Sequence, residues 1–346
     1  MYDKIHHDYL WETIQVFNLP PIFISSIKAL YSHAHMQVAI NSVLSQPFKV
    51  TRGVRQGDPL SCLLFDIAIE PLTCMLRNNQ GILGLAIPGT NKKLVVNMFA
   101  DNTTLYLSEL NNFDHVEKIL HQWCDVSGAR FNLEKTEIVP IGNNDHRLTI
   151  ANTRKINPQD LTPLNDKIHI ARDGEAVRSL GVWIGNKSHD LTPWEITLDK
   201  IKKKLDLWNK GRPTLHGKRT IVQTFIGGHT QYLTKGQGMP AHIETAITKL
   251  TRDFIWSDEM TPRLALNYLY KPIEEGSINL LDIHARNQAI EITWLKEYLN
   301  LMPLRPMWAT VMDILINRAA PPHMSALARI NTFIQSWDPP MRGNCT

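Results

Sequence analysis

The spacing of apolar residues predicts alternating helices and strands in the first part of the chain. Apolar side chains recur at helical intervals over residues 5–33, with a break at Pro20 and Pro21. Residues 35–50 alternate between apolar and polar side chains, which is typical of a strand, a turn and a second strand. A longer apolar stripe begins at Pro59 and predicts a helix that ends before a pair of glycines.

A hairpin and another helix are predicted next. Two apolar runs within residues 94–107 flank a turn that carries Asp101 and Asn102. Residues 113–127 then place their apolar side chains on one helical face, and Gly128 is expected to end that helix.

The rest of the chain changes from mixed structure to helices. Strands are predicted at 131–142 and 179–184. The polar stretch 143–178 between them predicts a surface insertion with one short strand at Lys167–Ala171. An α+β domain is therefore expected, followed by a helical appendage. The expected helices of the appendage cover 194–208, 218–233, 240–256 and 282–300.

Composition places the chain among globular proteins. Its 346 residues are 43% hydrophobic and 20% charged. No apolar run approaches the length of a membrane span, and the first ten residues contain no apolar signal region. The four cysteines form no CxxC pair, which argues against a zinc knuckle or a disulfide framework. A reducing compartment is expected, so the predicted location is intracellular, nuclear or cytoplasmic.

Positive charge is concentrated in one window. The net charge is +4, but residues 200–219 carry eight Lys or Arg and one acid, Asp206. That window is +7 and the remainder is −3. Such a patch on a nearly neutral protein indicates a polyanionic partner. The alternative is a solvated helix face without a partner.

Asp101 has two interpretations. Asp and Asn are common turn residues, so the hairpin alone explains them. The functional alternative is a metal ligand, because nucleotidyl transfer uses two divalent cations and Mg²⁺ prefers several converging carboxylates.

The segment Arg55–Ser61 also has two interpretations. It fits a polar loop followed by the start of a helix. In the functional interpretation, Gly57 allows a nucleotide or template base to approach the backbone. Gln56 offers both a donor and an acceptor, and Arg55 is suited to a phosphate.

Several blocks, taken in order, resemble one family. The chain is similar to the reverse transcriptase of non-LTR (LINE-type) retrotransposons over most of residues 2–300, with an N-terminal truncation. The blocks are Tyr2–Ile5 with His7–Leu10, Arg52–Ser61 with Phe65 and Pro71-Leu72, Phe99–Asn102, Gly128, Asn132 with Lys135-Thr136, Ser179–Val182, Phe254–Trp256 and Glu275–Leu280.

The resemblance implies a fold and an activity. The fold is an α+β right-hand polymerase palm, with a four-stranded antiparallel sheet and helices on one face, over residues 1–187, lacking most of the fingers. A helical thumb is expected over 188–256 and a helical C-terminal region over 257–346. The implied activity is RNA-directed DNA synthesis. The implied partners are an RNA template, a DNA primer, their hybrid and dNTP, with Mg²⁺ as cofactor and no membrane.

The resemblance also implies residue roles. Tyr2 is expected beneath the incoming sugar, where it excludes a ribonucleotide. Gln56 and Gly57 position nucleotide and template, and Asp101 holds metal. Lys135 lies near the triphosphate as a candidate proton donor, although a solvated lysine fits the same position. The expected contacts to the nucleic-acid backbone are Lys202, Lys203, Lys204, Arg212, Lys218 and Arg219.

Two departures from the family predict impaired catalysis. The family's first Asp precedes the position of Tyr2 and lies outside this sequence, and Asp3 is not its equivalent. Asn102 replaces the acid beside Asp101 with a neutral amide. We therefore expect weak Mg²⁺ binding and a catalytically impaired fragment. The alternatives are a non-catalytic nucleic-acid-binding remnant and a decayed open reading frame without function.

Overall fold

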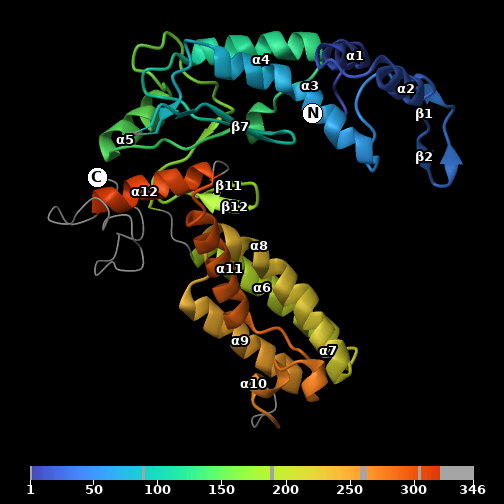
Figure 1. Ribbon diagram of the computed structural model, residues 1–346, viewed down its shortest axis with the longest axis vertical. Helices are drawn as coiled ribbons and strands as arrows, with labels where there is room; N and C mark the ends of the chain where they lie inside the picture. Colours follow the sequence, from blue (N-terminus) through green and yellow to red (C-terminus); the bar gives the residue numbers. More distant parts are fainter. Residues whose placement is uncertain (1, 88–89, 188–190, 258–262, 303–304, 320–346) are drawn as a thin grey trace. The chain divides into compact units, whose positions relative to one another are not determined.

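The computed structural model describes residues 2–87, 90–187, 191–257, 263–302 and 305–319 (Figure 1). The chain forms two compact units, Met1–Ile170 and Ala171–Thr346. The expected C-terminal helical region extends past 319, and that part lies outside the described residues. The division at residues 187 and 256 stays a prediction.

Four helices of the first unit confirm the sequence prediction. They are α1 (His7–Val16), α2 (Pro21–Ser32), α3 (Pro59–Asn78) and α4 (Phe113–Ser127). Both α2 and α3 begin with proline, whose fixed φ suits a first helical turn. The helix α4 ends at Gly128, which adopts the left-handed conformation with φ +73°.

The core of the first unit is built around α3. One face of α3 is almost fully buried against α1 and α4, and each large apolar side chain on it contributes about 1.5–3 kcal/mol. The most deeply buried side chains of that face are Leu64, Phe65, Ala68, Leu72 and Leu76.

The helix α3 is also long and apolar enough to cross a membrane, by length and composition alone. Among the described residues it is the only such helix, and 44% of its most apolar window is buried inside the protein. The prediction that no run approaches this length was therefore wrong. The buried face explains the apolar composition, because a core helix needs the same residues.

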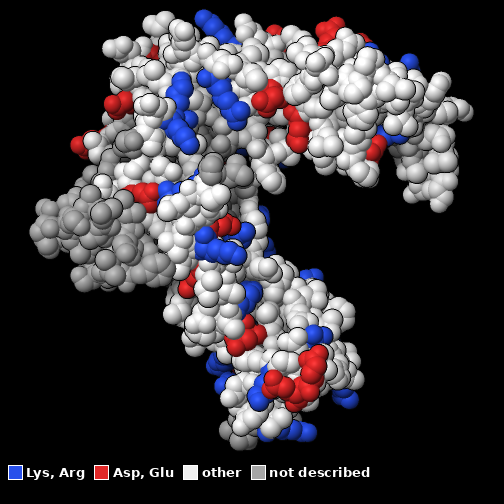
Figure 2. Space-filling view, viewed as in Figure 1, with Lys and Arg blue, Asp and Glu red and all other residues white. Residues whose placement is uncertain are grey.

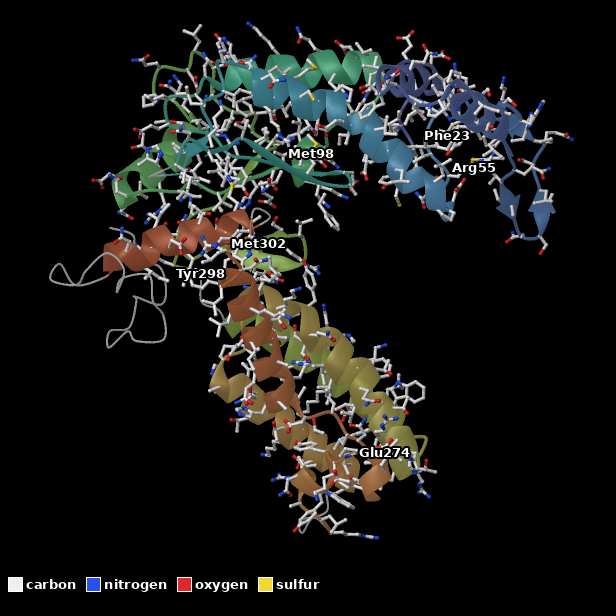
Figure 3. All side chains as sticks on the ribbon, viewed as in Figure 1. Phe23, Arg55, Met98, Glu274, Tyr298 and Met302 are labelled. Carbon is white, nitrogen blue, oxygen red and sulfur yellow. The ribbon has the colours of Figure 1, made fainter. Side chains whose placement is uncertain are left out.

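The predicted hairpin is present as β7 (Val96–Phe99) and β8 (Asn102–Leu105). These strands pair antiparallel, with Val96 opposite Leu105 and Phe99 opposite Asn102. The hairpin lies beside α3, where the Thr73 hydroxyl donates to the Met98 sulfur at 3.0 Å (Figure 3).

The other strands of the first unit are only two residues long. Within the described residues all strands pair two by two, so the single four-stranded sheet that was expected is not formed there. Strands of two to four residues offer few ladder positions to a third strand, and the hairpin packs against α3 through β7. The pairs are β1 (His35–Met36) with β4 (Phe48–Lys49), β2 (Ala39–Ile40) with β3 (Val43–Leu44), β5 (Leu85–Ala86) with β6 (Lys93–Leu94), and β9 (Glu137–Ile138) with β10 (His169–Ile170).

The expected surface insertion contains a helix, α5 (Asn144–Thr153), that the sequence pattern did not reveal. Ile150 is its only buried residue, so no apolar stripe marks it. Arg154 ends the helix and its guanidinium donates to the carbonyls of Leu164, Asn165 and Ile168 at 3.3, 2.7 and 2.7 Å. These bonds fix the loop that leads to the short strand β10, which confirms the predicted strand at 167–171.

The second unit begins with a hairpin. The single strand predicted at 179–184 is wrong, because β11 (Val177–Ser179) pairs with β12 (Val182–Ile184). Leu180 and Gly181 form the turn with φ values of +48° and +87°. The apolar character of Leu180 hides this turn in the sequence.

The expected helices of the second unit are confirmed. The helix α6 (Leu191–Asn209) runs antiparallel to one continuous helix made of α7, η2 and α8, in which η2 is a π-helical turn (Figure 1). Fully buried side chains such as Trp194, Ile201 and Ile226 form the core. The elements after α6 are α7 (Leu215–Ile221), η2 (Val222–Gly227), α8 (Gly228–Gln237), α9 (Ala241–Trp256), α10 (Leu266–Leu269), a 3₁₀ turn at Ile273–Glu275, α11 (Ile283–Tyr298) and α12 (Met307–Ala319). In the first unit, the strand predicted over 131–142 is reduced to the two residues of β9, because a 3₁₀ turn at Leu133–Lys135 occupies its first part.

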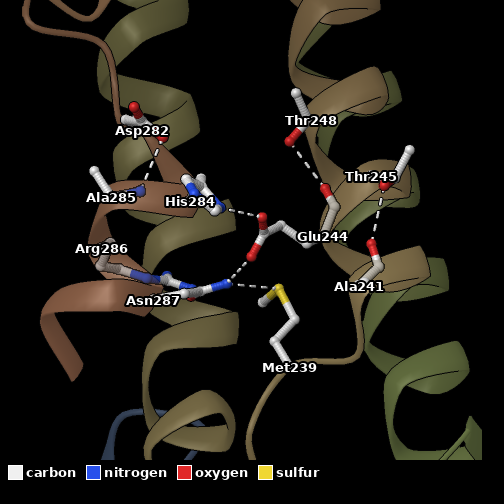
Figure 4. A network of polar contacts seen from close by, with 10 residues as sticks. All are labelled: Met239, Ala241, Glu244, Thr245, Thr248, Asp282, His284, Ala285, Arg286 and Asn287. Carbon is white, nitrogen blue, oxygen red and sulfur yellow. Dashed lines mark hydrogen bonds and ion pairs between the residues drawn. The ribbon is translucent and has the colours of Figure 1, made fainter. Parts of the chain in front are cut away.

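A polar network joins α9 to α11 (Figure 4). The Glu244 carboxylate accepts a hydrogen bond from the Asn287 amide at 2.7 Å, and its other oxygen lies 2.7 Å from His284 Nδ1. The bond to Glu244 raises the pKa of His284, and the charges of Asp282 and Glu291 add to the shift. The network therefore favours the protonated imidazole in the folded state.

We predict that Glu244→Gln lowers the melting temperature by about 2–4 °C, as expected when ~1 kcal/mol of charge-assisted bonding to Asn287 is lost. The folded state raises the pKa of His284, so the protonated imidazole beside Glu244 adds stability to the fold. This added stability is fully present below the ordinary histidine pKa and disappears as the pH rises through the pKa that His284 has in the folded state. Calorimetry should show a larger gap between variant and wild type at low pH than at high pH. Glu274→Gln, at an exposed site, is the control (Figure 3). A gap independent of pH would exclude the His284 contribution.

Candidate functional site

The first residues of the chain are held by backbone hydrogen bonds to two loops. The backbone amide of Val54 donates to the Tyr2 carbonyl at 3.0 Å, and that of His6 donates to the Ser127 carbonyl at 2.8 Å. Gly53 has φ +81°, and a Cβ there would lie 2.8 Å from the Asp3 Cα. The backbone approach therefore requires glycine at position 53.

This packing places Tyr2 over the core. Its ring stacks on Phe65, with centroids 4.1 Å apart and planes 13° apart. Burial raises the pKa of the Tyr2 hydroxyl, and a hydrogen bond with Cys62 and the charges of Asp66 and Asp101 raise it further. Tyr2 is thus a neutral ring with a fixed orientation.

The loop before α3 positions the next three predicted residues. The Arg55 guanidinium donates to the Leu30 carbonyl at 2.6 Å and lies over the Tyr31 ring (Figure 3). The Gln56 amide donates to the Asp3 carboxylate at 3.3 Å. Gly57 has φ +90°, and no atom lies within 4 Å of where its Cβ would be, so its surface is open to an approaching group.

The hairpin turn presents Asp101 at its tip. Ala100 adopts φ +51°, which turns the chain sharply between β7 and β8. Asn102 opens β8 opposite Phe99 and is exposed. The turn therefore holds Asp101 and Asn102 in different positions, one in the turn and one in the ladder.

A cavity of about 410 Å³ brings most of the predicted residues together. Tyr2, Arg55, Gln56, Gly57 and Asp101 all line it. Residues from the N-terminal segment, the loop before α3 and the hairpin thus meet at one place. Two further predicted residues, Asn102 and the exposed Lys135, are not among the residues that line this cavity.

Some of the lining residues have no role predicted from the sequence. Asp58 caps α3 by accepting from the Leu60 amide at 2.9 Å, and Ser61 and Cys62 follow in its first turn. Asp58 and Ser61 belong to the block that was recognised. Cys62 lies just beyond that block and carried no separate signal.

The donor set does not fit a two-cation centre. Three carboxylates line the cavity, but Asp3 accepts from Gln56 and Asp58 caps α3, and the neighbour of Asp101 is the neutral amide of Asn102. Within the parts of the chain that the structure describes, no three His, Cys, Asp or Glu side chains converge as a metal site requires. The arrangement can hold and orient a nucleotide-sized molecule through a ring, amides and a guanidinium.

The residues of the second unit that are predicted to contact the nucleic-acid backbone lie in different environments. Lys202, Lys203 and Lys204 are exposed on α6, and Lys203 pairs with Asp199 at 2.6 Å. Lys218 is instead buried, and its ammonium donates to the Ile255 carbonyl at 2.9 Å and to the Ser257 hydroxyl at 2.6 Å.

The two arginines of this set are more accessible. Arg219 is partly buried and donates to the Asn279 carbonyl at 3.3 Å. Arg212 is exposed, with φ +47°, and lines a second cavity with Lys218. Basic side chains are spread over the second unit and interspersed with acidic ones (Figure 2).

Comparison with known proteins agrees with the sequence blocks. Residues 1–184 match the family model described as reverse transcriptase (RNA-dependent DNA polymerase). The chain is 24% identical over 313 residues to the "Transposon TX1 uncharacterized 149 kDa protein" of Xenopus laevis, covering 90% of this chain and 22% of that protein. It is 26% identical over 141 residues to the retrovirus-related Pol polyprotein from type-2 retrotransposable element R2DM of Drosophila melanogaster, covering 40% and 13%. The chain therefore spans a small part of each relative, and the predicted resemblance to LINE-type reverse transcriptases is confirmed.

We predict that Gly53→Ala destabilises the protein more than Gly57→Ala. Both substitutions place a side chain at positive φ, but only the first drives a Cβ into backbone. The additional loss should be about 1–3 kcal/mol, as for overpacking elsewhere. Urea denaturation of the two variants measures the difference, and equal losses would contradict the close approach at Asp3.

Proposed function

This chain belongs to the reverse transcriptase family, and on that premise we propose that it binds template, primer and nucleotide but is catalytically impaired. It is a reverse transcriptase domain related to LINE-type retrotransposon proteins. RNA-directed DNA synthesis is the activity of the lineage. The partners proposed for this chain are an RNA–DNA hybrid and dNTP.

The observation that carries the proposal is the shared cavity. Tyr2, Gln56, Gly57 and Asp101 come from three separate segments and line one space of nucleotide size. In the proposed complex the rigid Tyr2 ring lies beneath the deoxyribose and leaves no room for a 2′-hydroxyl. Gln56 and the open surface of Gly57 contact the base and template.

Arg55 has a more limited part in this proposal. Its guanidinium is already engaged by the Leu30 carbonyl and the Tyr31 ring, which fixes the loop and leaves its remaining donors for a phosphate. Lys135 is proposed near the triphosphate, although it does not line the cavity.

The impairment follows from the hairpin turn. Divalent cations supply the charge that activates the 3′-hydroxyl and neutralises the triphosphate when they are bound. Asp101 is the proposed ligand here, and the amide of Asn102 cannot replace a second carboxylate. We therefore expect Mg²⁺ to bind weakly and nucleotide addition to be slow.

The proposed organisation follows the family. Residues 1–187 act as the palm, 188–256 as the thumb and 257–346 as a further C-terminal region. An intracellular location, nuclear or cytoplasmic, is part of the proposal. It rests on the thiols of Cys62, Cys74 and Cys124, which are free among the described residues.

Primer extension tests the proposed impairment. The assay contains an RNA template, a DNA primer, dNTPs and either Mg²⁺ or Mn²⁺. We expect less than about one-hundredth of the product made by a reverse transcriptase with a complete carboxylate set. Removal of one electrostatic group from an active site typically lowers the rate by about 10²–10³. Robust incorporation at a comparable rate would overturn the impairment.

A second function, that of a non-catalytic nucleic-acid-binding module, is favoured by the exposed lysines of α6. Changing Lys202, Lys203 and Lys204 together to Gln should weaken binding to an RNA–DNA hybrid and reduce the salt dependence of log Kd by up to about three units of slope. Fluorescence anisotropy at several salt concentrations measures this.

A matched control neutralises three exposed lysines elsewhere in the second unit, Lys249, Lys271 and Lys296, of which Lys271 also pairs with an acid. If both triple variants lose affinity equally, the α6 face has no special role. If wild-type protein binds no hybrid at low salt, the binding module is excluded and the third alternative, a chain without function, gains support.

A further inference from the structure

A row of ring side chains lies on the surface of the second unit. Trp208 from α6 contacts Phe225 of η2, with centroids 6.0 Å apart, and Phe225 contacts His229 of α8 at 6.2 Å. Tyr232 lies one further turn along α8. Trp208 is 47% exposed and Tyr232 57% exposed. We call Trp208, Phe225, His229 and Tyr232 the aromatic strip.

The strip ends at the turn of the β11–β12 hairpin. The Tyr232 hydroxyl donates to the Leu180 carbonyl. A Cβ at Gly181 would lie 2.9 Å from the Tyr232 ring, so the ring covers that glycine closely. This contact fixes Tyr232, and the hydrogen bond of His229 to the Phe225 carbonyl at 2.7 Å fixes the imidazole. Tyr232 and His229 are therefore held in place before any ligand binds.

Positive charge accompanies the strip on one side. Lys200, Lys204 and Trp208 are spaced four residues apart and so share one ridge of α6. Because α6 runs antiparallel to the α7–α8 helix, Lys204 is level with His229 when Trp208 is level with Phe225. Lys202 lies on the opposite flank of α6 by the same helical geometry.

Exposed rings with lysines beside them fit one class of ligand. Nucleic-acid bases stack on aromatic side chains whatever their sequence, and lysines follow the phosphates. A duplex hides its base faces, so the rings require unpaired bases. An apolar protein surface would leave Lys200 and Lys204 desolvated at its edge, and it fits less well.

We propose that the aromatic strip stacks the unpaired bases of a single nucleic-acid strand, with Lys200 and Lys204 along its phosphates. This goes beyond backbone contacts to a hybrid. It rests on the proposed function only in that the ligand is a nucleic acid.

The experiment compares a labelled single-stranded oligothymidylate with an abasic strand of the same length, by fluorescence anisotropy with the full chain. Wild-type protein should bind the base-containing strand about 5–20-fold more tightly, as stacking of one or two bases predicts. Trp208→Ala should lose most of this preference while binding to the abasic strand changes little. Trp208→Phe should keep part of it. Leu207→Ala, which truncates an exposed apolar side chain about 100° around α6 from Trp208, should keep the preference for bases.

Other outcomes overturn the proposal and separate it from the proposed function. Equal binding of both strands by wild-type protein removes the stacking site while leaving phosphate binding intact. No binding of either strand removes both. Self-association in sedimentation that Trp208→Ala relieves, without an effect on strand binding, assigns the strip to a protein contact. A His229→Ala variant with an unchanged melting temperature provides a second measurement if Trp208→Ala does not fold.

Discussion

Burial of one face of α3 connects the core of the first unit to its cavity. Leu64, Phe65 and Leu72 lie on that face, and each is at most 1% exposed. The same helix begins at its Asp58 cap and presents Cys62 to the cavity from its first turn. Phe65 also carries the Tyr2 ring. Core packing of α3 therefore fixes the position of the cavity wall. A shift of α3 would displace Cys62 and the Tyr2 ring together.

Close backbone approach is the second constraint on the same site. The N-terminal segment reaches the cavity only because Gly53 and Gly128 leave room for Asp3 and His6. The stacking of Tyr2 and the bond from Gln56 to Asp3 depend on that packing. These packed contacts hold the lining residues in one arrangement, as a preorganised binding site requires.

The sequence predicted those parts of the fold that leave a local signal. The bounds of α4 follow from an apolar stripe and a terminal glycine, and the cavity residues follow from blocks that survive as short motifs. The helix α5 buries only Ile150 and so has no stripe to detect. The turn at Leu180 lies inside an apolar run. Burial of Lys218 depends on helices distant in sequence, and a charged residue alone gives no sign of such packing.

Shape and charge are separable in the hairpin turn, and the proposed combination of retained binding and impaired catalysis depends on this separation. Asn102 occupies a ladder position that an aspartate would also fit, so the turn and the cavity form without the second acid. Ring stacking, hydrogen bonding and phosphate contacts by Tyr2, Gln56 and the α6 lysines need no cation. Nucleotide addition needs concentrated positive charge at Asp101, which a neutral amide does not recruit. On the function proposed above, loss of one carboxylate is therefore expected to impair catalysis before it impairs recognition.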